Sequence, residues 1–260
     1  MATNLMYHDI VAAGSEDTSG FPGRDAARYK VTPERFATHL DAVLDAAGSS
    51  GGALPLMITF DDGGVSATLA ADLLEARGLR GWFFITADYI GRPGFVDKDA
   101  LRDLHTRGHV VGSHSCSHPL RMARCSDNQL REEWTRSRSE LAGILGVDVT
   151  AASVPGGDYS TRVALAAGAA GLTHLFTSEP SCTVARVGPV AVHGRFVVRA
   201  GTSSRTIAAL AAGARWPAAR QRVAWNLRKA VKRTAGSAYL EVRRMLLRHG
   251  HEVAWGDIKD

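Results

Sequence analysis

The sequence has few cysteines and no long apolar run. The cysteines among its 260 residues, Cys116, Cys125 and Cys182, are odd in number and lack CxxC spacing, which argues against a disulfide framework or a cysteine zinc site. No apolar stretch approaches the ~20 residues that span a bilayer. The first residues lack the basic and apolar regions of a secretory signal. We therefore expect a cytoplasmic protein.

Charge is distributed unevenly along a chain of otherwise ordinary globular composition, with 45% hydrophobic and 22% charged residues. The net charge is +5, yet Arg215–Arg248 alone carries ten Lys and Arg against one acid, Glu241. The remainder is therefore mildly acidic. We predict one α/β domain over residues 1–213, followed by a basic helical extension over residues 214–260.

Short β-rich runs alternate with segments of helical period. The predicted strands are Leu5–Tyr7, Leu56–Phe60, Gly81–Thr86, His109–Gly112, Ala151–Val154, His174–Thr177 and Arg195–Val198. The predicted helices are Thr32–Ala47, Val65–Arg77, Asp97–Arg107, Ser126–Leu145, Ser160–Ala170 and Ser203–Ala212. This alternation predicts a parallel sheet with outer helices, closed or nearly closed into a barrel. Ala13–Tyr29, rich in Gly, Ser and Asp, is predicted to be a loop that is either functional or mobile, because loops of this length rarely serve as simple connections.

Two adjacent carboxylates follow the predicted strand Leu56–Phe60. Asp61 and Asp62 come directly after it and are followed by Gly63 and Gly64. The carboxyl ends of parallel strands form the functional edge of such folds. Neighbouring side chains at a strand end point apart, so the two aspartates are expected to have different roles. The structural alternative is that they cap the following helix.

A pair of histidines follows another predicted strand. His114 and His118 are four residues apart, so within one helical turn their rings would face the same way, with Cβ atoms about 6 Å apart. Two imidazoles and one carboxylate can bind a zinc ion and leave a position for water. A histidine pair alone is more often structural, but two strand-end motifs with suitable ligand types predict a metal site.

The TFDDG segment at Thr59–Gly63 and the HSCSH segment at His114–His118 resemble the first two motifs of polysaccharide deacetylases with a NodB-type domain, carbohydrate esterase family 4. The likeness runs from Leu5 to about Arg199. It implies a distorted (β/α)7 barrel that removes N-acetyl groups from amino sugars with one divalent metal, usually Zn²⁺ and sometimes Co²⁺ or Ni²⁺. It also implies Asp61 as general base and Asp62, His114 and His118 as metal ligands.

The later motifs depart from the family. The usual Arg-x-Pro-x-Gly is here Ser153-Val-Pro-Gly-Gly157, without its arginine, and the Leu-x-His motif is replaced by a strand ending in Arg199. A guanidinium stays protonated and cannot act as an acid, but it can orient a carboxylate. We therefore predict that Arg199 or Arg195 replaces the missing arginine. The residues expected at the substrate are Pro155, Gly156, Gly157 and Glu179.

The proton donor must then come from elsewhere, and His8 and His193 are the candidates. His8 ends the first predicted strand, and Asp9 is placed to fix its tautomer or to touch substrate. The Tyr-His-Asp run resembles the beginning of deacetylases associated with exopolysaccharide synthesis. The structural alternative is a histidine packed under the loop Ala13–Tyr29.

The expected partner is an N-acetylated sugar or glycoconjugate, and the alternative substrate is a small natural-product amino sugar. A non-catalytic, metal-containing sugar-binding domain is the other functional class, although such a domain has no use for Asp61. Trp216–Arg248 has three interpretations: a helix on anionic lipid, a clamp for an acidic substrate, or a packed helix with a solvated basic face. No motif indicates nucleic-acid binding.

Overall fold

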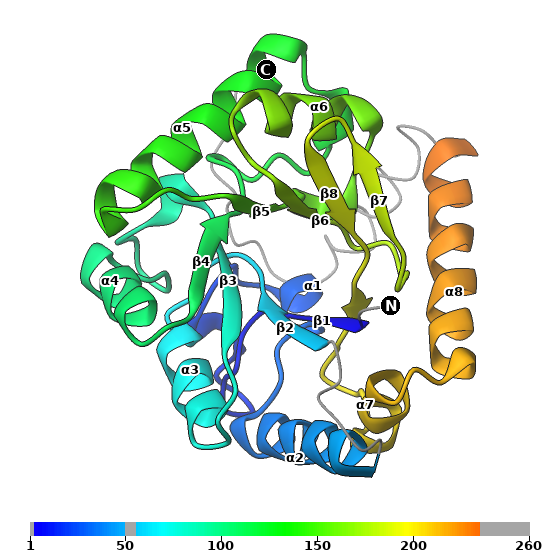
Figure 1. The fold of residues 1–260 in the computed structure, drawn as a ribbon. Helices are drawn as coiled ribbons and strands as arrows, with labels where there is room; N and C mark the ends of the chain where they lie inside the picture. Colours follow the sequence, from blue (N-terminus) through cyan, green and yellow to red (C-terminus); the bar gives the residue numbers. More distant parts are fainter. Residues whose placement is uncertain (1–2, 50–55, 235–260) are drawn as a thin grey trace. The chain divides into compact units, whose positions relative to one another are not determined.

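The computed structural model describes residues 3–49 and 56–234 (Figure 1). Its strands are β1 (Thr3–Tyr7), β2 (Leu56–Phe60), β3 (Gly81–Ile85), β4 (Val110–Ser113), β5 (Ala151–Ser153), β6 (His174–Phe176), β7 (Val184–Val187), β8 (Val190–His193) and β9 (Phe196–Val197). Its helices are α1 (Arg24–Ala27), α2 (Pro33–Ser49), α3 (Ala67–Glu75), α4 (Lys98–Thr106), α5 (Asp127–Leu145), α6 (Thr161–Ala169), α7 (Ser204–Ala211) and α8 (Arg215–Thr234). Short 3₁₀ turns, η1 to η4, cover Glu16–Thr18, Ala87–Tyr89, Met122–Arg124 and Pro155–Gly157.

The strands form a single curled sheet with the order β7-β8-β6-β5-β4-β3-β2-β1-β9. Only Gly194 and Arg195 separate β8 from β9, although the two strands lie toward opposite ends of this order. The sheet therefore curls into a distorted, incompletely closed barrel, with helices around its outside (Figure 1). This confirms the predicted fold class.

The sheet is mixed, which corrects the prediction of a purely parallel one. β7 pairs antiparallel with β8, while the other strand pairs are parallel. Both β7 and β8 lie in a stretch where the sequence predicted no strand. Each is four residues long, and β7 is largely exposed, so neither makes the continuous apolar run by which a buried strand is recognised.

Side chains alternate between the two faces of the sheet. On β2, Ile58 and Phe60 belong to the core under the outer helices, while Met57 belongs to a separate cluster with Phe84 and Phe176. Phe60 also stacks on Phe83, with ring centroids 4.7 Å apart. Burying one such aromatic side chain stabilises the fold by roughly 1.5–3 kcal/mol. This alternation places Thr59 and Asp61 on the opposite face from the outer core.

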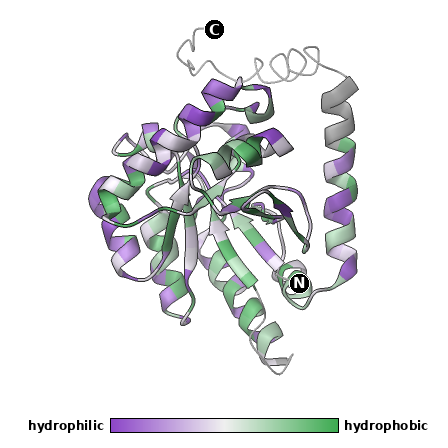
Figure 2. Ribbon diagram, turned by 45° about the horizontal axis from the view of Figure 1, so that its top comes forward, coloured by the Kyte–Doolittle hydropathy of each residue, from purple (hydrophilic) through white to green (hydrophobic). Residues whose placement is uncertain are grey.

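Helices α4 and α5 begin at residues whose side chains cap them. Ser126 and Gln129 form a reciprocal capping box at the start of α5, and Gly146 ends that helix with a φ of 73°. The Asp97 side chain caps α4 by accepting a hydrogen bond from the Ala100 N–H at 2.8 Å. Purple and green alternate along the helices (Figure 2), as expected when one side packs on the sheet and the other meets water.

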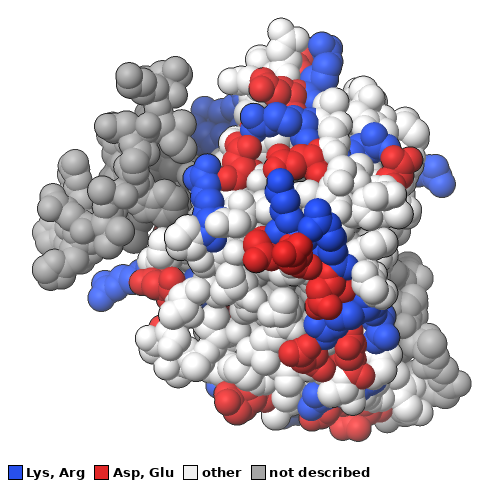
Figure 3. Space-filling view, turned by 90° about the vertical axis from the view of Figure 1, so that its left-hand side faces the viewer, with Lys and Arg blue, Asp and Glu red and all other residues white. Residues whose placement is uncertain are grey.

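Charged side chains of both signs interleave on the face that carries α4 and α5 (Figure 3). They include the ion pairs Arg102–Asp99, Arg136–Asp88 and Arg138–Asp148. Exposed pairs of this kind contribute at most ~1 kcal/mol each. This mixed surface therefore adds little to the stability of the fold.

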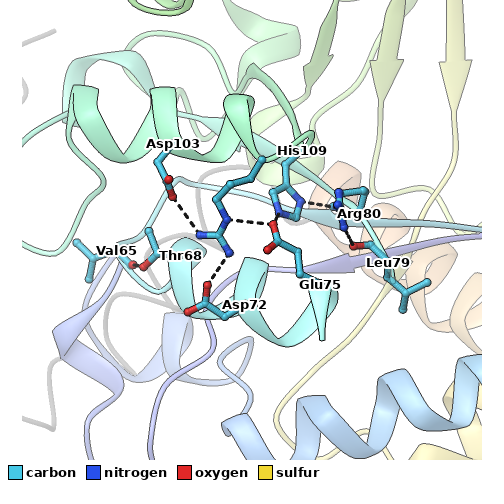
Figure 4. Close-up of polar contacts among 10 residues, drawn as sticks. Val65, Thr68, Asp72, Glu75, Leu79, Arg80, Asp103 and His109 are labelled. Atoms are coloured by element: carbon cyan, nitrogen blue, oxygen red, sulfur yellow. Dashed lines mark hydrogen bonds and ion pairs between the residues drawn. The ribbon is translucent and has the colours of Figure 1, made fainter. Parts of the chain in front are cut away.

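A denser polar network joins α3, α4 and the residue that precedes β4 (Figure 4). The Arg107 guanidinium bonds Asp72, Glu75 and Asp103. Glu75 also lies 2.9 Å from Nε2 of His109. The network is therefore at the amino end of β4, opposite the end that is followed by His114.

The chain divides into two compact units, residues 1–221 and 222–260. At the end of the first unit, the Gln221 amide accepts from the Val197 N–H at 3.0 Å and donates to the Val197 carbonyl at 3.1 Å. It thereby satisfies backbone groups of β9, which is an edge strand. Part of the predicted helical segment Trp216–Arg248 forms α8, and residues 235–248 lie outside the described residues. Among the described helices, none has the length and apolar character needed to cross a bilayer.

Candidate metal centre and active site

Asp62, His114 and His118 converge at the carboxyl ends of β2 and β4. Oδ1 of Asp62 lies 3.3 Å from Nε2 of His114 and 3.3 Å from Nε2 of His118. One ligand atom from each residue falls within 4.8 Å of the others. The structure thus brings together the three predicted metal ligands.

The hydrogen bonds of His114 test whether this group suits a cation. Its Nδ1 lies 3.0 Å from the carbonyl oxygen of Ser153, which only accepts, so Nδ1 carries the proton. In the neutral ring, Nε2 then carries a lone pair that faces the carboxylate oxygen of Asp62. Two acceptors in contact need a cation or a proton between them. Carboxylate and imidazole donors with such an outer hydrogen bond suit a divalent metal.

The electrostatics agree with this arrangement. Burial works to lower the pKa of His114, but the carboxylates of Asp61 and Asp62 outweigh it and the pKa is raised. Burial works to raise the pKa of Asp62, but the His114 and His118 imidazoles that face the carboxylate hold that pKa well below its usual range. The aspartate is therefore an anion that is ready to bind a metal.

The backbone is strained around the ligands. Asp62, Ser115 and His118 have φ values of 78°, 63° and 60°, in the left-handed region. Such a conformation costs a non-glycine residue roughly 1–3 kcal/mol and persists only where surrounding contacts enforce it. The backbone conformation that orients Asp62 and His118 therefore lowers the stability of the folded protein.

Asp61 lies beside the ligand group and is gripped by Arg195, which is fully buried. Nη1 and Nη2 of Arg195 donate to the two Asp61 oxygens at 2.7 and 2.8 Å. The other N–H groups reach Thr59 Oγ1, Ser153 Oγ and the Thr177 carbonyl at 3.1, 2.7 and 3.1 Å. All five guanidinium N–H donors are thus used, and the arginine has one orientation.

Arg195 keeps Asp61 ionised. Burial works to raise the pKa of the Asp61 carboxyl, but the charges of Arg195 and His114 outweigh it, and the pKa lies below its usual value. Of the two arginines predicted to orient the base, the structure selects Arg195. The Arg199 guanidinium lies 5.7 Å from the Tyr29 ring centroid instead, and its assignment to the catalytic group stays a prediction.

His8 is close enough to the two aspartates that its charge lowers the pKa of both. Its ring packs on Tyr29, with centroids 4.9 Å apart. Its Nδ1 is buried and has no hydrogen-bond partner among residues 3–49 and 56–234. The structure thus brings His8 to the same end of the barrel as the ligands, with one ring nitrogen unused.

His193, the other candidate acid, is placed differently. Its ring stacks on Phe176 at 4.6 Å, and its Nε2 lies 3.0 Å from Nδ1 of His174. Burial, together with the charge of His174, lowers its pKa to about 4. Near neutral pH it has no proton to give as an imidazolium, so His8 is the better placed histidine.

Asp9 serves the loop above the site rather than the His8 ring. Its Oδ1 accepts from the hydroxyls of Ser19 and Ser66 at 2.6 and 2.9 Å, and its Oδ2 lies 3.8 Å from the Lys30 ammonium. A Cβ at Gly64 would collide with the Asp9 carboxylate, which explains a glycine there. The Asp9 carboxylate is buried among these partners, and its predicted roles at His8 or at the substrate stay predictions.

The predicted loop Ala13–Tyr29 contains η1 and α1 and forms a wall of the site. The Lys30 ammonium donates to the carbonyls of Glu16, Ser19 and Phe21. The Phe21 ring then packs on His118, with centroids 4.8 Å apart. The buried Lys30 ammonium therefore fixes the loop backbone, and the loop contacts the predicted metal ligand His118 through Phe21.

The other predicted substrate residues, Pro155, Gly156, Gly157 and Glu179, follow β5 and β6. Pro155 is buried, and a Cβ on Gly156 would come within 2.9 Å of the Leu120 carbonyl oxygen, two residues past His118. A Cβ on Gly157 would collide with the Ser178 hydroxyl. The backbone carbonyl of Glu179 accepts a hydrogen bond from the backbone N–H of Arg195 at 2.9 Å. Burial and then the charge of Glu179 raise the pKa of Tyr159, so that carboxylate lies near the Tyr159 hydroxyl.

Sequence reasoning missed Thr59, Ser153 and Thr177. Ser153 has two roles, since its carbonyl faces His114 and its hydroxyl accepts from Arg195. The available signal was the two-residue period of strands, which puts Thr59 on the same side as Asp61. It could not reveal that an arginine from another strand reaches both.

Comparisons with known proteins agree with this architecture. Residues 50–175 match the polysaccharide deacetylase family. A polysaccharide deacetylase from Bacillus cereus superposes with a TM-score of 0.67 at 18% identity, over 81% of this chain and 68% of that one. The IcaB structure from Ammonifex degensii gives 0.63 at 22% identity, over 81% and 97% of the two chains.

A Streptococcus pyogenes deacetylase, PplD, solved in complex with acetate, gives 0.64 at 18% identity, over 78% of this chain and 95% of that one. A search of curated protein sequences gives no match. The fold, the family match and the Asp-His-His group agree, and residues 50–175 of the chain belong to the polysaccharide deacetylase family.

Proposed function

We propose that this protein is a metal-dependent N-deacetylase that hydrolyses the acetamide of an amino sugar in a glycan, glycolipid or sugar-containing metabolite. The observation that carries the proposal is the bidentate Arg195–Asp61 pair beside Asp62, His114 and His118. A site that only binds sugar through a metal needs the three ligands. It does not need a second carboxylate kept ionised at the same place.

In this proposal Asp62, His114 and His118 hold the metal, most simply Zn²⁺, with Co²⁺ and Ni²⁺ as alternatives. When bound, such an ion acidifies water and polarises a carbonyl. Asp61 accepts the proton of the attacking water, because Arg195 keeps it ionised and fixes its orientation. Ser153 orients His114 by accepting its Nδ1 proton.

His8 supplies the other proton. The bond between the acyl carbon and the sugar nitrogen breaks easily only when that nitrogen leaves as an amine, so a donor must protonate it. The charge of His8 acts on both aspartates, and its ring is steadied by Tyr29. We assign the donor to His8 and leave Arg199 outside the chemistry.

We also propose a cytoplasmic enzyme. The basic segment over residues 215–248 would then reach anionic lipid near membrane-bound glycan assembly. Sedimentation of the full chain with anionic vesicles at low and high salt tests the membrane contact separately from the activity. Binding that persists at high salt, or no binding at low salt, would rule out an electrostatic contact.

The deciding experiment measures acetate release from a panel of N-acetylated sugars and oligosaccharides by metal-loaded protein, with Asp61→Asn as control. Removing a general base costs about 10²–10⁴-fold in rate, while the bound metal per chain should not change. If wild-type protein with one metal per chain releases no acetate from any substrate, the enzyme proposal fails and a sugar-binding role takes its place.

A further inference from the structure

The turn that carries His118 is held by helix α5 through Glu133, a residue with no part in the chemistry proposed above. Oε2 of Glu133 accepts from the backbone N–H groups of Cys116 and Ser117 at 2.8 and 3.0 Å. Its Oε1 accepts from the Ser117 hydroxyl at 2.6 Å. One carboxylate therefore accepts from three donors within the three-residue segment between His114 and His118.

The opposite side of the turn is fixed by η2. The N–H groups of Ala87 and Asp88 donate to the carbonyls of Ser115 and Cys116 at 3.1 and 3.0 Å. The Cys116 thiol is buried and accepts from Nε of Arg136 at 3.0 Å. The turn is thus clamped between α5 and η2, although both flank the site without reaching the ligand atoms.

This clamp matters because the turn is strained. Ser115 and His118 both have left-handed backbone conformations, which an unconstrained chain with these side chains avoids. Without Glu133 the N–H groups of Cys116 and Ser117 lose their partners in the protein. The turn is then free to relax toward ordinary conformations, and His118 moves away from Asp62.

We propose that Glu133 is a positioning residue that preorganises the metal-binding turn, so that His118 is already aimed at Asp62 before the metal arrives. The proposal rests on the metal site of the proposed function and extends it to α5. Residues that orient metal ligands through hydrogen bonds typically change metal affinity by 10–100-fold when they are removed.

The test is the affinity of the full chain for Co²⁺ and Zn²⁺, measured by competition with a chelator. Glu133→Ala should weaken binding about 10–100-fold. Glu133→Gln should stay close to wild type, because its amide oxygen can accept both N–H groups while its NH₂ donates to Ser117. The matched control is Glu132→Ala, an exposed neighbour on the same helix, which should leave affinity unchanged.

A second readout separates positioning from a general loss of stability. In metal-free protein, hydrogen exchange at the amides of Cys116 and Ser117 should accelerate in Glu133→Ala and not in Glu133→Gln, while core strand amides stay protected. The proposal is overturned if Glu133→Ala binds metal like Glu132→Ala, or if those two amides keep wild-type protection. If Glu133→Ala does not fold, Ser117→Ala decides, with an expected loss of roughly two- to tenfold from one hydrogen bond and no loss as the contrary result.

The two proposals fail in different ways. A wild-type chain that takes up no metal removes the metal site and both proposals with it. A wild-type chain that binds metal but releases no acetate removes the enzyme and leaves the role of Glu133 open to the same affinity measurements.

Discussion

His109 and His114 stand at the two ends of β4, both buried and both next to a carboxylate. At the amino end, Nδ1 of His109 accepts from the Gly81 N–H at 3.0 Å and Nε2 faces Glu75 at 2.9 Å. At the carboxyl end, Nδ1 of His114 donates to a carbonyl, so Nε2 presents a lone pair to Asp62 at 3.3 Å. The first site completes its own hydrogen bonds (Figure 4), whereas the second is completed only by a cation.

The difference shows which of the two buried histidines is suited to bind a metal ion. A histidine near a carboxylate is common to both ends, and so is burial. The ring nitrogen that the backbone engages, and whether that backbone group donates or accepts, decides which nitrogen remains for a ligand. An N–H at His109 directs its proton to Glu75, and a carbonyl at His114 leaves a metal-binding nitrogen.

Replacing each of the two histidines by alanine should give the largest difference between the two ends of β4. His114→Ala removes a ligand, so metal binding should disappear at concentrations that saturate the wild type. His109→Ala leaves the Gly81 N–H without a partner and should cost about 1–3 kcal/mol of unfolding free energy with metal affinity unchanged. Calorimetric metal titration and denaturant melts check both, and a metal-binding defect in His109→Ala would break the comparison.

Arg195 and Arg199 offer a matched pair at the carboxyl end. Arg195→Met leaves the buried Asp61 carboxylate without its ion-pair partner and should lower the free energy of unfolding by about 3–5 kcal/mol. Arg199 is exposed, so Arg199→Met should change the free energy of unfolding by no more than about 0.5 kcal/mol. Without Arg195 the Asp61 pKa rises, so the acid limb of the pH–rate profile should move to higher pH. Equal stability and equal pH profiles in the two variants would refute the assignment.

Metal removal should affect only the carboxyl end. With free metal at 100 times its Kd, binding to the folded state adds about 2.7 kcal/mol, so treatment with EDTA should lower the wild-type unfolding free energy by that amount. His109→Ala should lose the same amount and His114→Ala none. An EDTA effect in His114→Ala would mean that another site holds the metal.

The smallest effect concerns protonation at the amino end. Burial lowers the pKa of His109 in the folded protein below its usual 6.5, despite Glu75. The unfolded chain then binds the extra proton first, so this contribution to stability is present above about pH 6.5 and is lost as pH falls below it. NMR titration should show His109 as the Nε2–H tautomer titrating below 6.5, and a pKa above 6.5 would contradict this.

Much of the fold could be predicted because its signals are local. The period of α5 and its Ser126 and Gly146 boundaries are visible in neighbouring residues, and so is the apolar run of β2. The hairpin of β7 and β8 could not be predicted in this way. Its strands are short and β7 is exposed, so pairing within the sheet, rather than pattern, makes them strands.

The sequence by itself determined which residues are the candidate metal ligands and the candidate base. Asp61, Asp62, His114 and His118 lie in two short segments at strand ends, where ligand chemistry and spacing are readable. Only the tertiary structure decided that Arg195 rather than Arg199 holds Asp61, and that Asp9 belongs to the loop while His8 faces the aspartates. Those choices depend on where the chain crosses from β8 to β9 and how the loop folds back over β1, which are distances between segments far apart in sequence.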